Sequence, residues 1–147
     1  MAITLKQIDS SNWMDAINLE LTEKQEEFIA ENWYSLLEAN YEKNNYPFGI
    51  YKDDTMIGFC MYCLDHDYDV GRWVICRLMI DKNHQRKGYG SEALKLLFAK
   101  MKDAHGVSDI YISTDPNNKN AIKMYEKNGF AKTGEIVYDE AVFKISV

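Results

Sequence analysis

The segment 85–90, with the sequence Gln-Arg-Lys-Gly-Tyr-Gly, has the residue types of a phosphate-binding loop. It follows an apolar run over 73–80 and precedes a helical stretch over 91–102. Gly88 and Gly90 let the backbone approach a ligand, and the start of a helix presents free N–H groups and a positive dipole end. The sequence therefore predicts a pyrophosphate site. A tight turn with solvated basic side chains is the alternative, because glycines often only mark a turn.

The spacing of this loop excludes two common nucleotide-binding loops. A Walker A loop requires G-x-x-x-x-G-K-[ST], which nothing in the chain fits. A dinucleotide fingerprint requires three glycines near the start of a domain. The segment 85–90 has two glycines and lies past the middle of the chain.

Length and charge limit the class of protein and of partner. A chain of 147 residues predicts one domain over 1–147 with a sizeable core. The formal net charge of -6 argues against nucleic acid as a partner. An acidic protein with a locally basic loop suits a phosphate-bearing cofactor and a small cationic substrate.

The cysteines and the apolar segments indicate a cytoplasmic protein without a metal or a membrane partner. Cys60 and Cys63 form a C-x-x-C, but three positions apart on a strand they face opposite sides. With Cys76 they make an odd number inside predicted strands, so we expect reduced cysteines rather than disulfides or a zinc site. Residues 1–6 read as a strand rather than a signal peptide, and no run approaches the roughly 18 apolar residues of a membrane span.

The elements that must position the loop can be read from periodicity and turn residues. A cap at 10–12 predicts a short helix through Trp13 and Leu19, and Thr22 caps a second helix. The apolar face of that second helix, which ends near 46–48, is predicted to comprise Phe28, Ile29, Trp33, Leu36 and Leu37.

The rest of the chain alternates strands and helices. Strands are predicted over 48–52, 56–64, 73–80, 110–114, 133–137 and 142–147, and helices over 91–102 and 121–127, with a polar loop over 65–71. The helical crossover between 73–80 and 110–114 implies that these two strands are parallel. We therefore expect an α/β fold with a mixed sheet and helices on both faces.

Two separated motifs resemble those of one superfamily. Gln85-x-x-Gly88-x-Gly90 resembles the acyl-CoA pyrophosphate loop of the GNAT N-acetyltransferases, and Asn118-x-x-Ala121-x-x-x-Tyr125-x-x-x-Gly129-Phe130 resembles their second cofactor motif. The resemblance covers essentially the whole chain. It implies the GNAT fold, a mostly antiparallel central sheet with a splayed parallel strand pair, and acetyl-CoA as the cofactor.

A narrower resemblance is to the bacterial spermine/spermidine (diamine) acetyltransferases. It rests on 57–62, on 77–81, on Gln25-x-x-Phe28 and on 35–39. It implies transfer of acetyl to a primary amine of a polyamine, with a homodimer common among relatives. Relatives of this type can carry a carboxylate just before the arginine at 77, where this chain has Cys76.

The resemblance also implies which residues bind the cofactor. The backbone of the central strand end is expected to hold the pantetheine arm, and one of its N–H groups to polarise the thioester carbonyl. The expected cofactor contacts are Leu78, Met79, Ile80, Gln85, Arg86, Lys87, Gly88, Tyr89, Gly90, Ser91, Asn118 and Tyr125. The side chains of the strand end are expected to be core, and Asn118 also suits a helix cap.

Tyr125 is the predicted catalytic residue, as the general acid for the leaving thiolate. A phenol of pKa about 10 can protonate a thiolate whose conjugate acid lies near ~8.5 only if it is held close to the sulfur. A core aromatic on the buried side of the helix with Ala121 and Ile122 is the alternative interpretation.

The amine site is expected to be acidic, because a polyamine is a string of ammonium charges. The candidate substrate-binding residues are Glu23, Glu26, Glu27, Asp65 and Asp67, together with Asp69. A solvated acidic surface is the alternative for each of them. His66 is either a base or an idle surface histidine, and water relays to several acids would leave no single base.

Other functions stay open at this point. Another small amine, such as an aminoglycoside or an amino acid, and a peptide N-terminus are alternative acceptors. A CoA-sensing module without turnover is the alternative from another class of protein.

Overall fold

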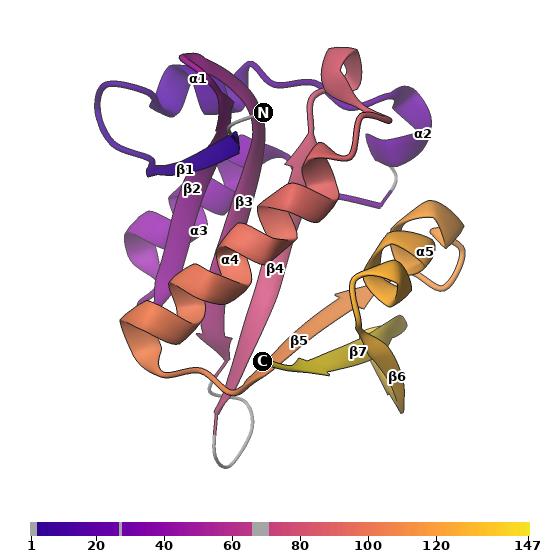
Figure 1. Cartoon of the computed structure of the whole chain (residues 1–147). Helices are drawn as coiled ribbons and strands as arrows, with labels where there is room; N and C mark the ends of the chain where they lie inside the picture. The colour runs from indigo at the N-terminus through magenta and orange to yellow at the C-terminus, as the bar shows by residue number, and fades with distance from the viewer. Residues whose placement is uncertain (1–2, 27, 66–70) are drawn as a thin grey trace.

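The computed structural model describes residues 3–26, 28–65 and 71–147. Within them, seven strands form one sheet in the order β1-β2-β3-β4-β5-β7-β6 (Figure 1). Their bounds are β1 (Ile3–Gln7), β2 (Asn45–Lys52), β3 (Thr55–Asp65), β4 (Arg72–Ile80), β5 (Asp109–Thr114), β6 (Ala131–Val137) and β7 (Glu140–Ser146). The helices are α1 (Trp13–Ile17), α2 (Glu23–Glu26), α3 (Asn32–Tyr41), α4 (Tyr89–His105) and α5 (Lys119–Lys127), with a 3-10 turn η1 (Lys82–His84).

The pairing of β4 with β5 is the parallel step in an otherwise antiparallel sheet. It is short: only Trp73 faces Ile110 and Val74 faces Tyr111. Beyond this point the two strands diverge, as Figure 1 shows. The predicted α/β fold with a mixed sheet and a splayed parallel pair is confirmed.

A bulge in β4 determines which side chains face α3. Tyr62 pairs with Ile75 and Met61 pairs with Arg77, so Cys76 is an extra residue on β4. The Arg77 side chain reaches α3, where its Nε donates to the Ser35 hydroxyl at 2.9 Å. The bulge therefore presents both Cys76 and Arg77 on the α3 side of the sheet.

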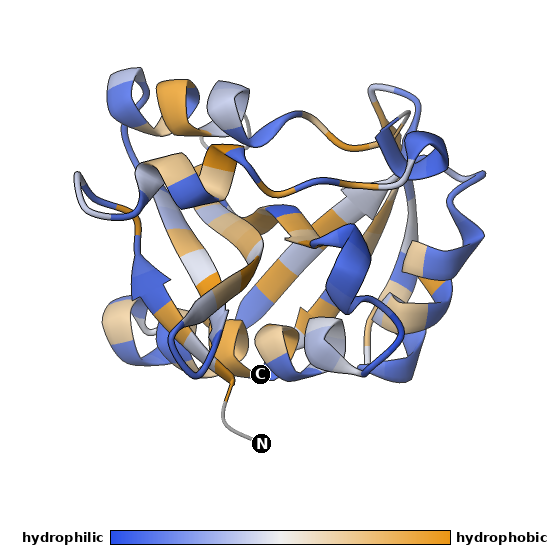
Figure 2. Ribbon diagram, turned by 90° about the horizontal axis from the view of Figure 1, so that it is seen from above, coloured by the Kyte–Doolittle hydropathy of each residue, from blue (hydrophilic) through white to orange (hydrophobic). Residues whose placement is uncertain are grey.

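Each face of the sheet has its own core. On one face α4 and α5 bury Leu94, Leu97, Met101 and Tyr125. On the other face Ala16 of α1 joins buried β3 and β4 side chains, with Ile29 and Leu36 packed against them. Figure 2 shows helices on both sides of the sheet and hydrophobic residues along the strands. Burial on both faces explains the long apolar runs of β3 and β4.

The single helix predicted from Thr22 to about 46 is wrong. The chain forms α2 and α3, and Glu31 between them is extended with φ -65° and ψ 147°. Ile29 and Leu36 face the core, whereas Trp33 and Leu37 are about half exposed at 50% and 51%. The helical spacing therefore joined residues that belong to two separately oriented segments. β2 also begins earlier than predicted, at Asn45, because Tyr46 stacks on Tyr62 across the hairpin.

Candidate active site

The diverging strands β4 and β5 border a cavity of about 450 Å³. One wall comes from β4 and the segment 28–30, and the other from β5, α5 and the β6–β7 hairpin. This cavity, called the cleft below, opens where the sheet loses its backbone pairing. Within the described strands, β4 from Ile75 to Ile80 has no partner on β5, so the backbone of β4 borders the cleft.

The predicted pyrophosphate loop follows β4 and leads into the first turn of α4. Arg86 and Gly88 adopt left-handed conformations with φ 63° and 82°. Gly88 is the N-cap of α4, and a Cβ placed on it would meet nothing within 4 Å. The first turn of α4 has no carbonyl acceptors within its own helix. The loop therefore combines free space, helix N–H groups and the positive end of a 17-residue helix.

Gln85 ties this loop to its surroundings. Its Nε2 donates to the Ile80 carbonyl at 2.8 Å and to Oε1 of Gln25 at 2.8 Å. The Gln25 amide returns a hydrogen bond of 3.0 Å. The two glutamines therefore connect α2, the end of β4 and the loop.

The other predicted cofactor contacts differ in the burial and the hydrogen bonding of their side chains. Tyr89, the first residue of α4, is buried in the core, and Ser91 accepts a hydrogen bond of 2.9 Å from Asn128, the C-cap of α5. Met79 is buried, and Leu78 and Ile80 are packed against the core from β4. The side chains of Tyr89 and Met79 are buried, so these two residues offer a cofactor their backbone, whereas Leu78 also lines the cleft. Gly90 lies against Met124, whose sulfur would be 2.8 Å from an added Cβ.

Asn118 and Tyr125 both line the cleft from the α5 side. The Asn118 side chain caps α5 by accepting from the Ala121 N–H at 3.4 Å. Tyr125 is 8% exposed and packs edge-on against Phe130 and Phe143. Burial raises the pKa of the Tyr125 phenol, and the negative charge of Glu140 raises it further. Tyr125 is thus a core aromatic that also borders the cleft and keeps its proton at neutral pH.

The end of α5 holds Tyr125 in place. Gly129 has φ 102°, its N–H donates to the Glu126 carbonyl, and the Phe130 N–H donates to the Tyr125 carbonyl at 3.0 Å. These two bonds are the Schellman motif, which requires a residue in the left-handed conformation after the helix. Gly129 is therefore the C′ glycine of α5.

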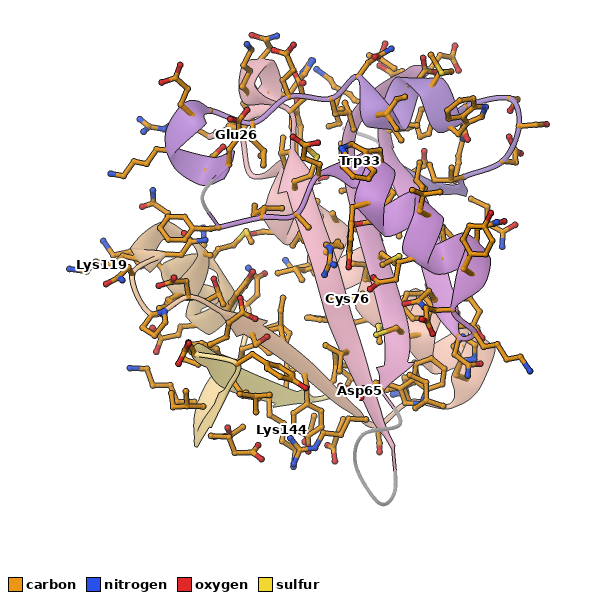
Figure 3. The ribbon with its side chains drawn as sticks, turned by 180° about the vertical axis from the view of Figure 1, so that it is seen from behind. Glu26, Trp33, Asp65, Cys76, Lys119 and Lys144 are labelled. Atoms are coloured by element: carbon orange, nitrogen blue, oxygen red, sulfur yellow. The ribbon has the colours of Figure 1, made fainter. Side chains whose placement is uncertain are left out.

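Of the predicted acidic residues, the structure places Asp65, Glu23 and Glu26. Asp65, at the end of β3, lines the cleft. Glu23 and Glu26 are exposed on α2, outside the cleft lining, and Figure 3 shows Glu26 and Asp65 at opposite ends with Cys76 between them. Glu27, Asp67 and the loop residues His66 and Asp69 lie outside the described residues.

Glu140, the acid whose charge affects the pKa of Tyr125, is not among the residues predicted from the sequence. Glu140, the first residue of β7, lines the cleft and accepts a hydrogen bond of 2.9 Å from the Ser113 hydroxyl. The predicted strand began at Val142, which left Glu140 in the turn. Glu140 lies two positions before Val142, a spacing that places both on one face of a strand. The spacing does not show that this strand pairs with β5.

The opposite wall carries two thiols and two arginines, Arg72 and Arg77. Cys63 and Cys76 line the cleft, whereas Cys60 is buried in the core, so the C-x-x-C pair is split as predicted. The hydrogen bond between the thiols lowers the pKa of Cys63, and that bond together with burial raises the pKa of Cys76. In the part of the chain that the structure describes, no cluster of three or more His, Cys, Asp or Glu side chains could hold a metal.

The fold and the cleft are those of an acyl-CoA-dependent acetyltransferase. The family model of the acetyltransferase (GNAT) family matches residues 7–130, and the chain belongs to this family. A "probable spermine N(1)-acetyltransferase" of Bacillus subtilis subsp. natto is 31% identical over 95% of this chain and 94% of the relative. The spermine/spermidine N(1)-acetyltransferase of B. subtilis strain 168 is 30% identical with the same coverage.

Solved structures of low sequence identity share the fold. A spermidine N-acetyltransferase from Vibrio cholerae, in complex with CoA and spermine, has a TM-score of 0.76 at 15% identity and covers 98% of this chain and 95% of that one. The PaiA N-acetyltransferase of Thermoplasma acidophilum, in complex with coenzyme A, has a TM-score of 0.72 at 15% identity over the full length of both chains.

The protein is an acetyl-CoA-dependent N-acetyltransferase, and its residues fit that cofactor. The open space at Gly88 and the first turn of α4 suit the pyrophosphate, and the edge of β4 that has no β5 partner beyond Val74 suits the amide groups of a pantetheine arm. Among the described helices, none is long and apolar enough to span a membrane.

Proposed function

We propose that this N-acetyltransferase transfers acetyl to a primary amine of a polyamine such as spermidine or spermine. The observation that carries the proposal is that the carboxylates of Asp65 and Glu140 line the same cleft as Tyr125. The two arginines of this cleft, Arg72 and Arg77, each lie against another glutamate. The two Bacillus relatives, whose names give spermine or spermidine as substrate, support the same acceptor. Carboxylates around the reacting group suit a substrate with several ammonium charges.

The proton balance of the reaction shows which proton transfers the protein must assist. Acetyl-CoA supplies the acetyl group as a thioester. The amine forms one N–C bond, one C–S bond breaks, and an ammonium acceptor loses two protons, of which one ends on the thiol and one in solvent. The chain must therefore accept a proton on the amine side and donate one on the sulfur side.

Tyr125 is proposed as the donor to the sulfur. Tyr125 lines the cleft. Phe130 and Phe143 pack against its ring and so restrict where its hydroxyl points. A phenol whose pKa is raised by burial stays protonated until the sulfur departs. Proton transfer from a phenol to a thiolate is unfavourable in water. Tyr125 can therefore act as the acid only because it is held close to the sulfur and water is excluded.

The loop and the strand end are proposed to bind and polarise the cofactor. Backbone N–H groups over 86–91 would hold the pyrophosphate, with added charge from Arg86 and Lys87 and a contact from Asn118. One N–H group of Leu78, Met79 or Ile80 would donate to the thioester oxygen, where negative charge develops. Such a fixed donor stabilises the transition state more than the bound substrate.

A thiol-release assay with a panel of amines tests this function. We expect release with spermidine and spermine, and at least tenfold lower kcat/KM with lysine and an aminoglycoside, a difference of about 1.4 kcal/mol in transition-state binding. A peptide with a free N-terminus covers the remaining acceptor class. Thiol release with the aminoglycoside or the peptide but not with polyamines would remove the polyamine proposal.

Glu23 and Glu26 stay predictions for amine binding, because α2 presents them to solvent. Substitution of both by Gln tests them. The homodimer and the cytoplasmic location expected from the sequence also stay predictions. Sedimentation of the purified chain tests the first.

A further inference from the structure

Glu140 lines the same cleft as Tyr125, and the inference drawn from it rests on the proposed acetylation of an amine. We propose that the Glu140 carboxylate binds the ammonium group of the acceptor and holds the reacting nitrogen opposite Tyr125. Glu140 lines the cleft from the wall that also carries Tyr125, and the opposite wall carries Cys76 rather than a carboxylate before Arg77.

The backbone around Glu140 holds its side chain in one place. Glu140 pairs with Val137 across a two-residue turn at Tyr138 and Asp139, both with positive φ of 50° and 64°. Positive φ at both central residues is the geometry of the tight hairpin turn. On the neighbouring strand Ser113 pairs with Val142, so Ser113 and Glu140 lie on the same face of the sheet.

The carboxylate keeps one oxygen for a ligand. The Ser113 hydroxyl donates to Oε1 at 2.9 Å, and the side chain is half-buried. Each carboxylate oxygen can accept more than one hydrogen bond, so Oε2 and part of Oε1 are available to an ammonium group. A half-buried carboxylate oriented by a hydroxyl group gives a directed, charge-assisted hydrogen bond.

The positive side chains of the cleft are engaged by other acids. Arg72 forms a two-point contact with Glu135 at 2.9 and 3.2 Å, and Arg77 lies 3.5 Å from Glu38. Among the described residues, no lysine or arginine forms an ion pair with Glu140. The carboxylate therefore contributes negative charge that an incoming cation can match.

Glu140 and Tyr125 line the same cleft, so an amine bound by the carboxylate stays close to the phenol. The charge of Glu140 also contributes to the raised pKa of the Tyr125 phenol. Tyr138, 89% exposed, contributes an aromatic residue to the lining of the same cleft. A ring of this kind can bind a second ammonium group of a polyamine through a cation–π contact.

Three variants separate this role from a structural one. Glu140→Gln removes the charge and keeps the shape, Ser113→Ala removes the hydroxyl that orients the carboxylate, and Asp139→Asn removes a neighbouring charge outside the cleft lining. Asparagine tolerates the left-handed conformation of residue 139, so the control should keep the turn. The melting temperature of each variant reports folding.

The loss of one charge-assisted hydrogen bond predicts that Glu140→Gln raises the KM for spermidine by about 10- to 100-fold. Ser113→Ala should raise it by less, and Asp139→Asn should leave it within about twofold, because an exposed charge contributes little. Calorimetric titration of spermidine into the CoA-saturated protein should show the same order without turnover, while the Kd for CoA stays unchanged in all three variants.

The outcomes distinguish this inference from the proposed function. If the wild-type protein acetylates polyamines and Glu140→Gln keeps both the KM and the calorimetric affinity, the Glu140 inference is overturned and the function stands. If another amine is the acceptor, that amine replaces spermidine in the same comparison. If no amine binds or reacts, both the function and the inference are overturned.

Discussion

Gln25 and Gln85 hydrogen-bond to each other in both directions, at 2.8 and 3.0 Å, across 60 positions of sequence. Gln85 also donates to the Ile80 carbonyl, so one side chain connects α2 to the strand end and to the loop. Gln85→Ala removes all of these contacts and should weaken CoA binding by about tenfold, the effect of one net hydrogen bond.

Gln25→Ala is the matched control for this prediction. It removes the amide pair but leaves the Gln85 bond to Ile80, so its loss of CoA affinity should be smaller. Calorimetry with CoA measures both. Equal affinity of Gln85→Ala and wild-type protein for CoA would show that this side chain does not organise the loop.

Gly88 and Gly106 allow the loop to be tested against an equivalent backbone position. Both have left-handed φ, of 82° and 66°, and a Cβ on either meets nothing within 4 Å. Substitution by Ala should cost about 1–2 kcal/mol of stability at each, because an L-residue is strained there. Only Gly88→Ala should also weaken CoA binding, since its methyl group enters the space before α4. A similar CoA affinity in both variants would argue against pyrophosphate binding at this loop.

Tyr125→Phe tests the general acid. It removes the hydroxyl and keeps the ring packed against Phe130 and Phe143. We expect kcat to fall by about 100-fold or more, as for a lost general acid, with the Kd for CoA within about twofold of wild type. Tyr34→Phe, an exposed tyrosine on α3, should change neither quantity. An unchanged kcat in Tyr125→Phe would leave this residue with a core role alone.

Alkaline pH should destabilise the protein through Tyr62. Burial first, and then the charges of Tyr46 and Cys60, raise the pKa of Tyr62 to about 12. The folded pKa lies above the unfolded value, so this contribution to stability is complete below about pH 10 and is lost as pH rises through about 12. Tyr62→Phe should remove up to about 2.5 kcal/mol of this pH dependence, while Tyr34→Phe should not. Urea unfolding at a series of alkaline pH values measures the difference, and equal slopes in the two variants would contradict it.

The sequence predicted the features that depend on local spacing. The glycine-bearing turn before α4 and the capping role of Asn118 follow from turn and cap chemistry within a few residues, although α4 begins at Tyr89 rather than at 91. The C-x-x-C pair also divided between two faces as strand alternation requires. These features involve short sequence distances, where periodicity and backbone preference carry the information.

The features that depend on strand pairing could not be read in the same way. The apolar spacing over 28–37 predicted one helix, but residues 28–30 precede α3 and border the cleft. Ile29 and Leu36 contact the same core from two different segments, which produced the helical spacing. Glu140 reaches the cleft only through the register of β7 against β5. Cys76 faces α3 only because of the bulge in β4, which no single-strand pattern reveals.

The central claim is that this acetyltransferase acts on polyamines, and a competition assay tests it most directly. The protein is given acetyl-CoA with equal concentrations of spermidine, spermine, lysine, an aminoglycoside and a peptide with a free N-terminus, and mass spectrometry identifies the acetylated products at early times. We predict N-acetylspermidine and N-acetylspermine as the dominant products. Acetylation mainly of the peptide, the lysine or the aminoglycoside would contradict the claim.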